Sequence, residues 1–147
     1  MANIAIFVGS MYGNAENLAD TVAKQLINQG HGVNVHMDGT IEQVKQAETL
    51  LFISSTTGQG DLPDNIYPLF LQLQSQFPML TGKKAGVIAL GDSSYGDTFC
   101  GAGRQIDGLL QELAATQVMP RLDVDACEYF EPWEAVEAWL QDWQAQL

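Results

Sequence analysis

Three stretches of this sequence combine glycines with hydroxyl or amide side chains: GSMYGNA at 9–15, SSTTGQGDLPD at 54–64 and GDSSYGDTFCGAG at 91–103. The first lies between the apolar run 4–8 and a segment of helical periodicity. Such a turn exposes backbone N–H groups at the start of a helix, where they bind anions. No Lys or Arg lies in it, so a bound anion would be held without a cationic side chain. An ordinary tight turn explains the same residues about equally well.

Standard nucleotide-binding motifs do not describe the first stretch, which lacks the GK[ST] ending of a P-loop and the GxGxxG spacing of a dinucleotide-binding turn. In the second stretch, Gly58 and Gly60 allow the backbone to approach a flat ligand or to change its peptide conformation. In the third, Tyr95 is flanked by small residues. Its ring either stacks on a planar ligand or is half-buried with a hydrated hydroxyl.

Two other chemistries are excluded. GDSSYG resembles the nucleophile elbow GxSxG, but Tyr95 stands where the last glycine is required, and the histidines His31 and His36 lie outside the three stretches. A phospho-accepting receiver domain needs an acidic cluster after strand 1, an Asp after strand 3 and a Lys after strand 5. The sequence has at those places Gly9-Ser10, Ser54-Ser55 and Asp123 to Asp125.

Apolar and β-branched runs alternate with helix-period segments along the whole chain. The runs predict strands at 3–9, 32–37, 49–55, 85–91 and 118–124. The periodic segments predict helices at 14–29, 64–76 with Asp64 as its cap, 100–115 and 132–146, and a shorter one at 40–47. This alternation predicts a single-domain, three-layer α/β/α fold over residues 1–147, with a five-stranded parallel sheet of order 2-1-3-4-5.

In such a sheet, a ligand binds outside the carboxyl ends of the strands, beside strand 1. The three glycine-rich stretches follow predicted strands 1, 3 and 4, so all three are expected to meet at that crevice. Their convergence is the strongest functional signal in the sequence.

Composition limits the partners. Eighteen Asp and Glu against six Lys and Arg give a net charge of −12, which argues against nucleic-acid and anionic-membrane surfaces. The charge serves solubility alone or steers the protein onto basic partners. The chain has two cysteines without a CxxC pair, no cationic leader and no apolar stretch near the roughly 18 residues of a membrane span. We therefore expect a cytoplasmic monomer without a metal site.

The three stretches together resemble those of the flavodoxins, and most closely the short bacterial MioC/YqcA-like subgroup, from residue 4 to about 143. The family's phosphate loop reads roughly S/T-x-T-G-N-T. Ser10, Gly13 and Asn14 match it, whereas Tyr12 and Ala15 replace hydroxyl residues. The resemblance implies that the phosphate of FMN binds at 10–15, on the residues Ser10, Met11, Tyr12, Gly13, Asn14 and Ala15.

The resemblance also assigns the other two loops. It implies that Thr56, Thr57 and Gly58 lie beside the isoalloxazine, with Thr57 where an aromatic residue is common. It implies that Tyr95 is the outer stacking ring. The remaining cofactor-binding residues that it implies are Gly91, Asp92, Phe99 and Cys100, of which Asp92 and Cys100 offer backbone groups to the pyrimidine edge.

The resemblance implies a low-potential electron carrier that shuttles single electrons between a reductase and acceptor enzymes and is not itself an enzyme, because the redox chemistry belongs to the cofactor. Its expected partners are basic-surfaced redox proteins, namely a flavin or iron–sulfur reductase and an acceptor enzyme. Two alternatives remain open. They are an FMN-dependent NAD(P)H:quinone-type reductase and a flavin-free interaction module on the same fold.

Overall fold

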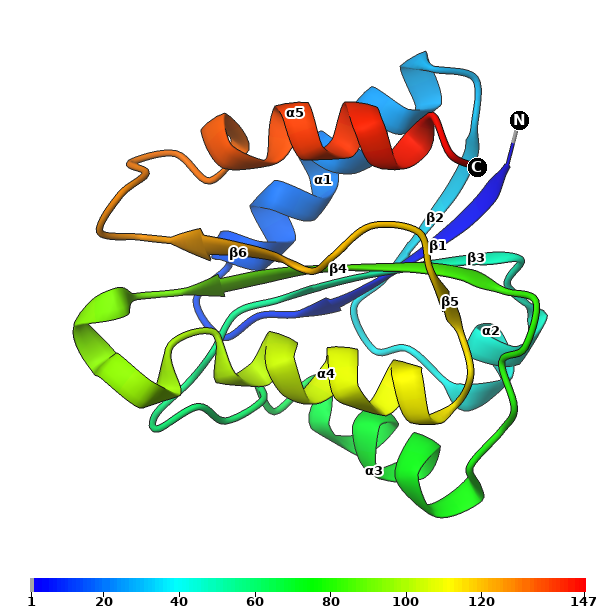
Figure 1. Ribbon diagram of the computed structural model, residues 1–147, viewed down its shortest axis with the longest axis horizontal. Helices are drawn as coiled ribbons and strands as arrows, with labels where there is room; N and C mark the ends of the chain where they lie inside the picture. Colours follow the sequence, from blue (N-terminus) through cyan, green and yellow to red (C-terminus); the bar gives the residue numbers. More distant parts are fainter. Residues whose placement is uncertain (1) are drawn as a thin grey trace.

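The structure, a computed structural model, describes residues 2–147 as a parallel sheet between two layers of helices (Figure 1). The strands run in the order β2-β1-β3-β4-β5, with β6 paired to β4. This order confirms the predicted flavodoxin-like α/β topology. The strands are β1 (Asn3–Gly9), β2 (Gly32–His36), β3 (Thr49–Ser54), β4 (Lys84–Gly91), β5 (Thr116–Gln117) and β6 (Leu122–Asp125). The helices are α1 (Asn14–Asn28), α2 (Ile41–Gln46), α3 (Tyr67–Gln76), α4 (Gly101–Glu112) and α5 (Trp133–Gln144).

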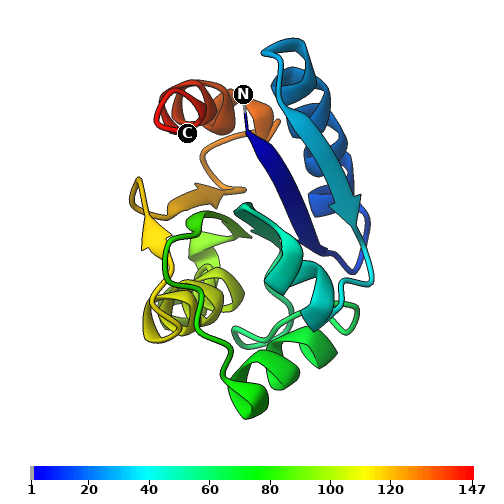
Figure 2. The ribbon, with the colours of Figure 1, turned by 90° about the vertical axis from the view of Figure 1, so that its right-hand side faces the viewer.

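The central strands β1, β3 and β4 are buried along almost their whole length because helices cover both faces of the sheet (Figure 2). On one face, α1 and α5 contribute Leu18, Val22 and Trp143 to a core with alternate strand residues. On the other face, α2, α3 and α4 pack their apolar side chains against the remaining residues of the same strands. The cores hold the sheet, and the sheet fixes where its loops emerge.

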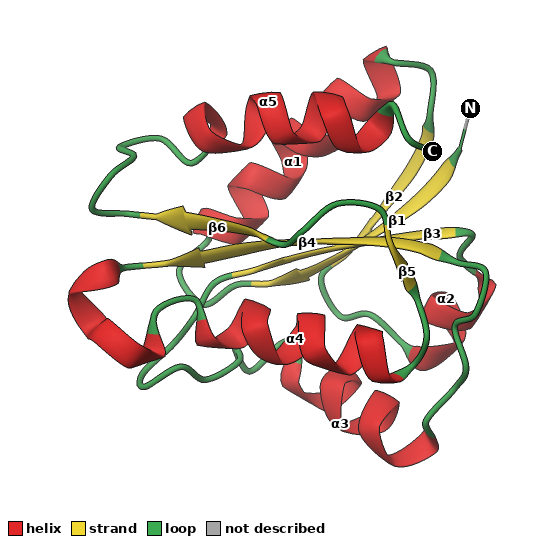
Figure 3. Ribbon diagram, viewed as in Figure 1, coloured by secondary structure: helices red, strands yellow, loops and turns green. Residues whose placement is uncertain are grey.

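The predicted fifth strand at 118–124 is wrong as a continuous element. Its place is filled by β5 and β6, which both pair with β4 and are separated by residues 118–121 (Figure 3). Pro120 lies in this gap, and proline has no N–H to donate to a ladder. Its carbonyl accepts a bond of 3.1 Å from the Trp139 indole instead. Arg121 turns towards α4 and pairs with Asp107 at 3.1 Å.

The predicted start of the third helix is also wrong. Helix α3 begins at Tyr67 with Ile66 at its N-cap, and no side chain caps it, so Asp64 is not the cap. Residues 64–66 form a turn, and the N–H groups of Ile66 and Tyr67 both donate to the Pro63 carbonyl. The short helix at 40–47 is present as α2, closed by a capping box of Thr40 and Gln43. No helix within residues 2–147 has the length and apolarity that crossing a membrane requires.

Candidate functional site

A cavity of about 780 Å³ lies at the carboxyl ends of β1, β3, β4 and β6. The three glycine-rich loops meet there, as their positions after strands 1, 3 and 4 predict. The predicted residues that line the cavity are Met11, Tyr12, Asn14, Thr56, Thr57, Gly58, Gly91, Asp92, Tyr95, Phe99 and Cys100. Ser10, Gly13 and Ala15 belong to the same stretch 9–15 but are not among the lining residues.

The first loop presents unpaired N–H groups at the start of α1. Gly13 is the N-cap residue and adopts a φ of 91°, in the left-handed region that favours glycine. Its N–H donates to Ser10 Oγ at 3.0 Å, which leaves the hydroxyl hydrogen of Ser10 free to donate elsewhere. The N–H groups of residues 11, 12 and 14–16 have no acceptor within residues 2–147. Because Ala15 is fully buried, its unpaired N–H is a group that an anion would satisfy.

Asn65 holds this loop through a hydrogen bond to Ser10, and no motif in the sequence pointed to this residue. Its Oδ1 accepts from the Ser10 N–H at 2.9 Å. Its Nδ2 donates to the carbonyls of Val8 and Met37, both at 2.7 Å. The Ser10 N–H is therefore engaged inside the protein and is not one of the free donors.

The second loop is a small closed turn. Thr57 and Asp61 exchange two backbone hydrogen bonds of 2.9 and 2.8 Å. Gly58 and Gly60 between them have φ values of 50° and 92°. Helix α4 fixes the turn from outside, because Gln105 Nε2 donates to the Gly60 carbonyl at 2.8 Å. The residue that lines the cavity at position 57 is a threonine, so this wall has no aromatic ring there.

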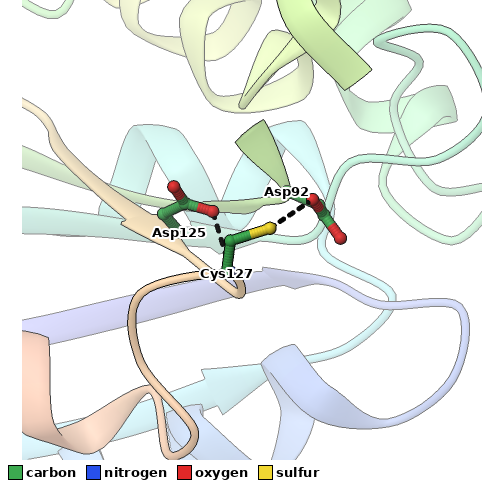
Figure 4. A group of neighbouring side chains, drawn as sticks. All are labelled: Asp92, Asp125 and Cys127. Atoms are coloured by element: carbon green, nitrogen blue, oxygen red, sulfur yellow. Dashed lines mark hydrogen bonds between the residues drawn. The ribbon is translucent and has the colours of Figure 1, made fainter. Parts of the chain in front are cut away.

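The third loop is ordered by two carboxylates and a thiol (Figure 4). Asp92 Oδ1 accepts from the N–H and hydroxyl of Ser94 at 2.9 and 2.6 Å, and from the thiol of Cys127 at 2.9 Å. Asp125 Oδ1 accepts from the backbone N–H groups of Ser93 and Cys127. Oxygen and sulfur atoms of Asp92, Asp125 and Cys127 lie within 4.8 Å of one another, an arrangement that these hydrogen bonds account for.

The same hydrogen bonds set the charge of this corner. The Cys127 thiol, and then Ser94, lower the pKa of Asp92 below its ordinary value. Donation from Ser93, and then from the Cys127 N–H, lowers the pKa of Asp125. Both side chains are therefore carboxylates throughout the neutral range, beside a cavity whose rim also holds Tyr95, which is 66% exposed.

Cys100 lies behind the third loop and is fully buried. It is the N-cap residue of α4, with a φ of 54°, and its thiol lies 3.5 Å from the Ala89 carbonyl. Burial raises the pKa of Cys100 to about 12, with the nearby Asp123 adding to the shift. A Cβ at Gly91 would lie 2.7 Å from the Cys100 nitrogen, so the end of β4 packs directly on this backbone. Cys100 is therefore a neutral packing residue and not a redox thiol.

The cavity has a further wall, which none of the three glycine-rich stretches provides. The segment from β6 to the start of α5 contributes Tyr129, Phe130, Glu131 and Trp133. The Phe130 side chain is 92% exposed, at the mouth of the cavity. The rule that placed the other loops would have found this wall, because the aromatic run CEYFEPW at 127–133 begins three residues after the end of the last predicted strand. Helix α1 completes the lining with Asn17, Leu18 and Thr21.

Parallel strands, a helix N-terminus with unpaired N–H groups and a roomy cavity at the switch point define an α/β protein of the mononucleotide-binding class. Within this class, the family model described as flavodoxin matches residues 6–139. The chain belongs to the flavodoxin family.

Individual relatives agree with this assignment. The chain is 44% identical over 145 residues to flavodoxin YqcA of Pectobacterium carotovorum, covering 97% of this chain and 95% of that one. It is 34% identical over 143 residues to protein MioC of Escherichia coli K12, covering 97% of both. A cysteine-to-serine mutant of flavodoxin from Pseudomonas aeruginosa superposes with a TM-score of 0.91 at 41% identity, covering 97% of each chain.

Membership in this family also gives the cofactor and the function. The protein is an FMN-binding electron carrier and not an enzyme in its own right. Redox chemistry of this kind belongs to the flavin, while the protein supplies binding and electrostatics.

Proposed function

We propose that FMN binds in the cavity at the carboxyl ends of β1, β3 and β4, with its phosphate on the loop 10–15. The observation that carries this proposal is the set of unpaired N–H groups at the start of α1, among them that of the buried Ala15. The field of the helix N-terminus favours an anion there, which explains how a phosphate can be held without Lys or Arg. The Ser10 hydroxyl and the Asn14 amide are further donors.

The rest of the cavity suits the isoalloxazine ring. In this proposal, Tyr95 stacks on its outer face, while Thr56, Thr57 and Gly58 lie along its inner side. Gly91, Asp92, Phe99 and Cys100 surround the pyrimidine edge, where backbone groups recognise its polar atoms. Since Thr57 offers no ring, stacking comes from one side only, and the shape of the turn 57–61 has a correspondingly larger part in holding the flavin.

FMN, when bound, supplies the one-electron chemistry, and the residues around it bind and orient it. Backbone groups of the turn 57–61 set the hydrogen bonding along one edge. The carboxylates of Asp92 and Asp125 place negative charge beside the cavity, which disfavours addition of further negative charge there. This electrostatic environment favours a low reduction potential of the bound flavin.

We further propose that the partners are basic-surfaced redox proteins, namely a flavin or iron–sulfur reductase and an acceptor enzyme. The net charge of −12 supports this proposal. So does the position of Lys83 and Lys84, which lie at the amino end of β4, opposite the cavity. The proposal treats residues 1–147 as one FMN-binding domain that acts as a cytoplasmic monomer without nucleic-acid or membrane contacts.

The test is spectroscopic. Purified protein would be titrated with FMN, riboflavin and FAD, and the complex then reduced stepwise with dithionite under argon. We expect a yellow, FMN-specific complex that takes up two electrons in separate one-electron stages. Reduction in a single two-electron stage, together with direct oxidation of NAD(P)H, would support the reductase alternative instead. A colourless protein that binds none of the flavins would leave only the interaction module.

A further inference from the structure

Asn65 is a polar side chain outside the cavity that makes three hydrogen bonds: two end on β1 and the phosphate loop, at Val8 and Ser10, and one ends on Met37, the residue after β2. We propose that Asn65 is a positioning residue for the phosphate of FMN, which it affects by fixing the Ser10 peptide before the ligand arrives. This inference rests on the proposed function, because it concerns the same loop. Asn65 does not line the cavity, so it acts through Ser10 and not by touching the ligand.

The side-chain amide of Asn65 uses all of its donors and its acceptor. Oδ1 of Asn65 accepts from the Ser10 N–H at 2.9 Å, and Nδ2 donates to the Val8 and Met37 carbonyls at 2.7 Å. Val8 lies at the end of β1, and Met37 directly follows β2. One side chain therefore joins two neighbouring strand ends to the first residue of the loop. Both hydrogens of its amino group and its carbonyl are used, so its orientation is fully determined.

The bond from Ser10 to Asn65 also determines which donors of the loop stay free. With its N–H held by Asn65, Ser10 has one orientation of its peptide, and its Oγ lies 3.0 Å from the Gly13 N–H. This contact closes the turn and leaves the Ser10 hydroxyl hydrogen and the N–H groups of residues 11, 12 and 14–16 without internal acceptors within residues 2–147. Asn65 thus binds the Ser10 N–H, and loss of this hydrogen bond would let the turn 10–13 change its conformation.

Asn65 is itself held in place by the packing of its neighbour. The next residue, Ile66, is buried, and a Cβ at Gly9 would lie 2.7 Å from its Cγ2 atom. The turn that carries Asn65 is therefore pressed directly against the last residue of β1. A binding loop preorganised in this way loses less conformational freedom when the ligand binds, and the gain appears in affinity.

The experiment compares FMN with riboflavin, which lacks the phosphate. Apoprotein of wild type, Asn65→Ala and Asn65→Leu, which both remove the acceptor for the Ser10 N–H, would be titrated with both flavins, and dissociation constants would be read from quenching of flavin fluorescence. We expect the variants to weaken FMN binding by about tenfold or more, because the donors are no longer preset, and riboflavin binding by less than about threefold. Asn34→Ala, an exposed asparagine on β2, is the matched control and should leave both constants unchanged.

Equal weakening of both flavins would overturn the proposal, because a merely structural role gives that result, and so would unchanged FMN binding. If wild type bound no FMN, the proposed function itself would fail. Far-UV circular dichroism would establish that the variants fold. Amide hydrogen exchange on wild-type apoprotein gives a measurement that needs no variant: the Ser10 N–H should exchange more slowly than those of Met11 and Tyr12. Equal exchange of the three groups would also contradict the proposal.

Discussion

At the scale of single residues, the two cysteines differ sharply in what they can do. Cys100 is fully buried with a pKa raised to about 12, whereas the Cys127 thiol is exposed beside Asp92. In native apoprotein at pH 8, a thiol reagent should modify Cys127 and leave Cys100 intact, because Cys127 is exposed to the reagent, whereas Cys100 is buried and its raised pKa keeps it in the unreactive thiol form. Mass spectrometry after brief labelling would find one modified cysteine, and two after denaturation. Cys127→Ser should show none in the native state, and native labelling of Cys100 would contradict its burial.

The carboxylate of Asp125 gives a prediction of pH dependence. Hydrogen bonds lower its folded-state pKa below the ordinary value of 3.8, so the folded protein binds this proton less readily than the unfolded chain does. The stabilisation is therefore fully present above pH 3.8 and is lost as the pH falls through the folded pKa. We expect Asp125→Asn to be less stable than wild type at pH 6, and the difference to shrink towards pH 3.

Chemical denaturation at several pH values would measure this difference. Asp20→Asn is the control, since this side chain is exposed on α1 and does not line the cavity, and its difference from wild type should not follow the same curve. A difference between wild type and Asp125→Asn that stayed constant from pH 6 to pH 3 would refute the assigned pKa direction.

At the scale of elements, the contact between α4 and the turn 57–61 shapes the cavity. A Cβ at Gly101 would lie 2.7 Å from Gly60 Cα and 2.8 Å from its carbonyl oxygen, and backbone cannot move aside as a side chain can. Gly101→Ala should lower the free energy of unfolding by about 1–3 kcal/mol and weaken FMN binding. Gly108→Ala, on the same helix with nothing within 4 Å, should raise it by about 0.5–1 kcal/mol. Urea denaturation compares the two, and equal effects would show that the contact is unimportant.

The elements also show how far the sequence determines the structure. Periodicity and β-branched runs were sufficient to predict the sheet order and the meeting of three loops. Both follow from the alternation of strands with helices and from the right-handed crossovers between parallel strands. The division of the last strand was not predicted, since it depends on Trp139 and Asp107, which lie far from Pro120 and Arg121 in sequence. The start of α3 was misjudged because Asp64 has the right residue type for a cap but lies three residues before the helix.

The candidate site likewise contains residues that the sequence could predict and residues that it could not. The lining residues of three loops could be named from their types and positions, and the structure brings most of them together. Asn65 could not be found in this way, because its partners lie 28 to 57 residues away along the chain. Phe130 could have been found, by applying the carboxyl-end rule to the last strand as well.

At the scale of the whole molecule, charge is distributed unevenly. Lys45, Lys83 and Lys84 lie near the amino ends of β3 and β4, and the lysine Nζ atoms of 83 and 84 donate to nearby carbonyls. The opposite end, where the cavity opens, carries acidic residues on or beside the lining loops: Asp61, Asp92, Asp97, Asp125, Glu128 and Glu131. Arg104 lies there as well and donates to the Asp97 carbonyl. A protein with this asymmetry should turn its cavity towards a basic partner before contact.

This orientation is testable with a generic acceptor. Reduced holoprotein would be mixed with a basic c-type haem protein in a stopped-flow instrument, at ionic strengths from about 10 mM to about 500 mM. We expect the second-order rate constant to fall by about tenfold or more over this range, because salt screens the attraction that aligns the two proteins.

Glu131→Lys, at the cavity, should lower the rate constant severalfold at low salt and have little effect at high salt. Glu48→Lys changes the net charge equally, but at the far end of the sheet, and should have a smaller effect. If the two variants slowed the reaction equally, net charge and not its distribution would govern the encounter. If neither did, electrostatic steering towards the cavity would be refuted.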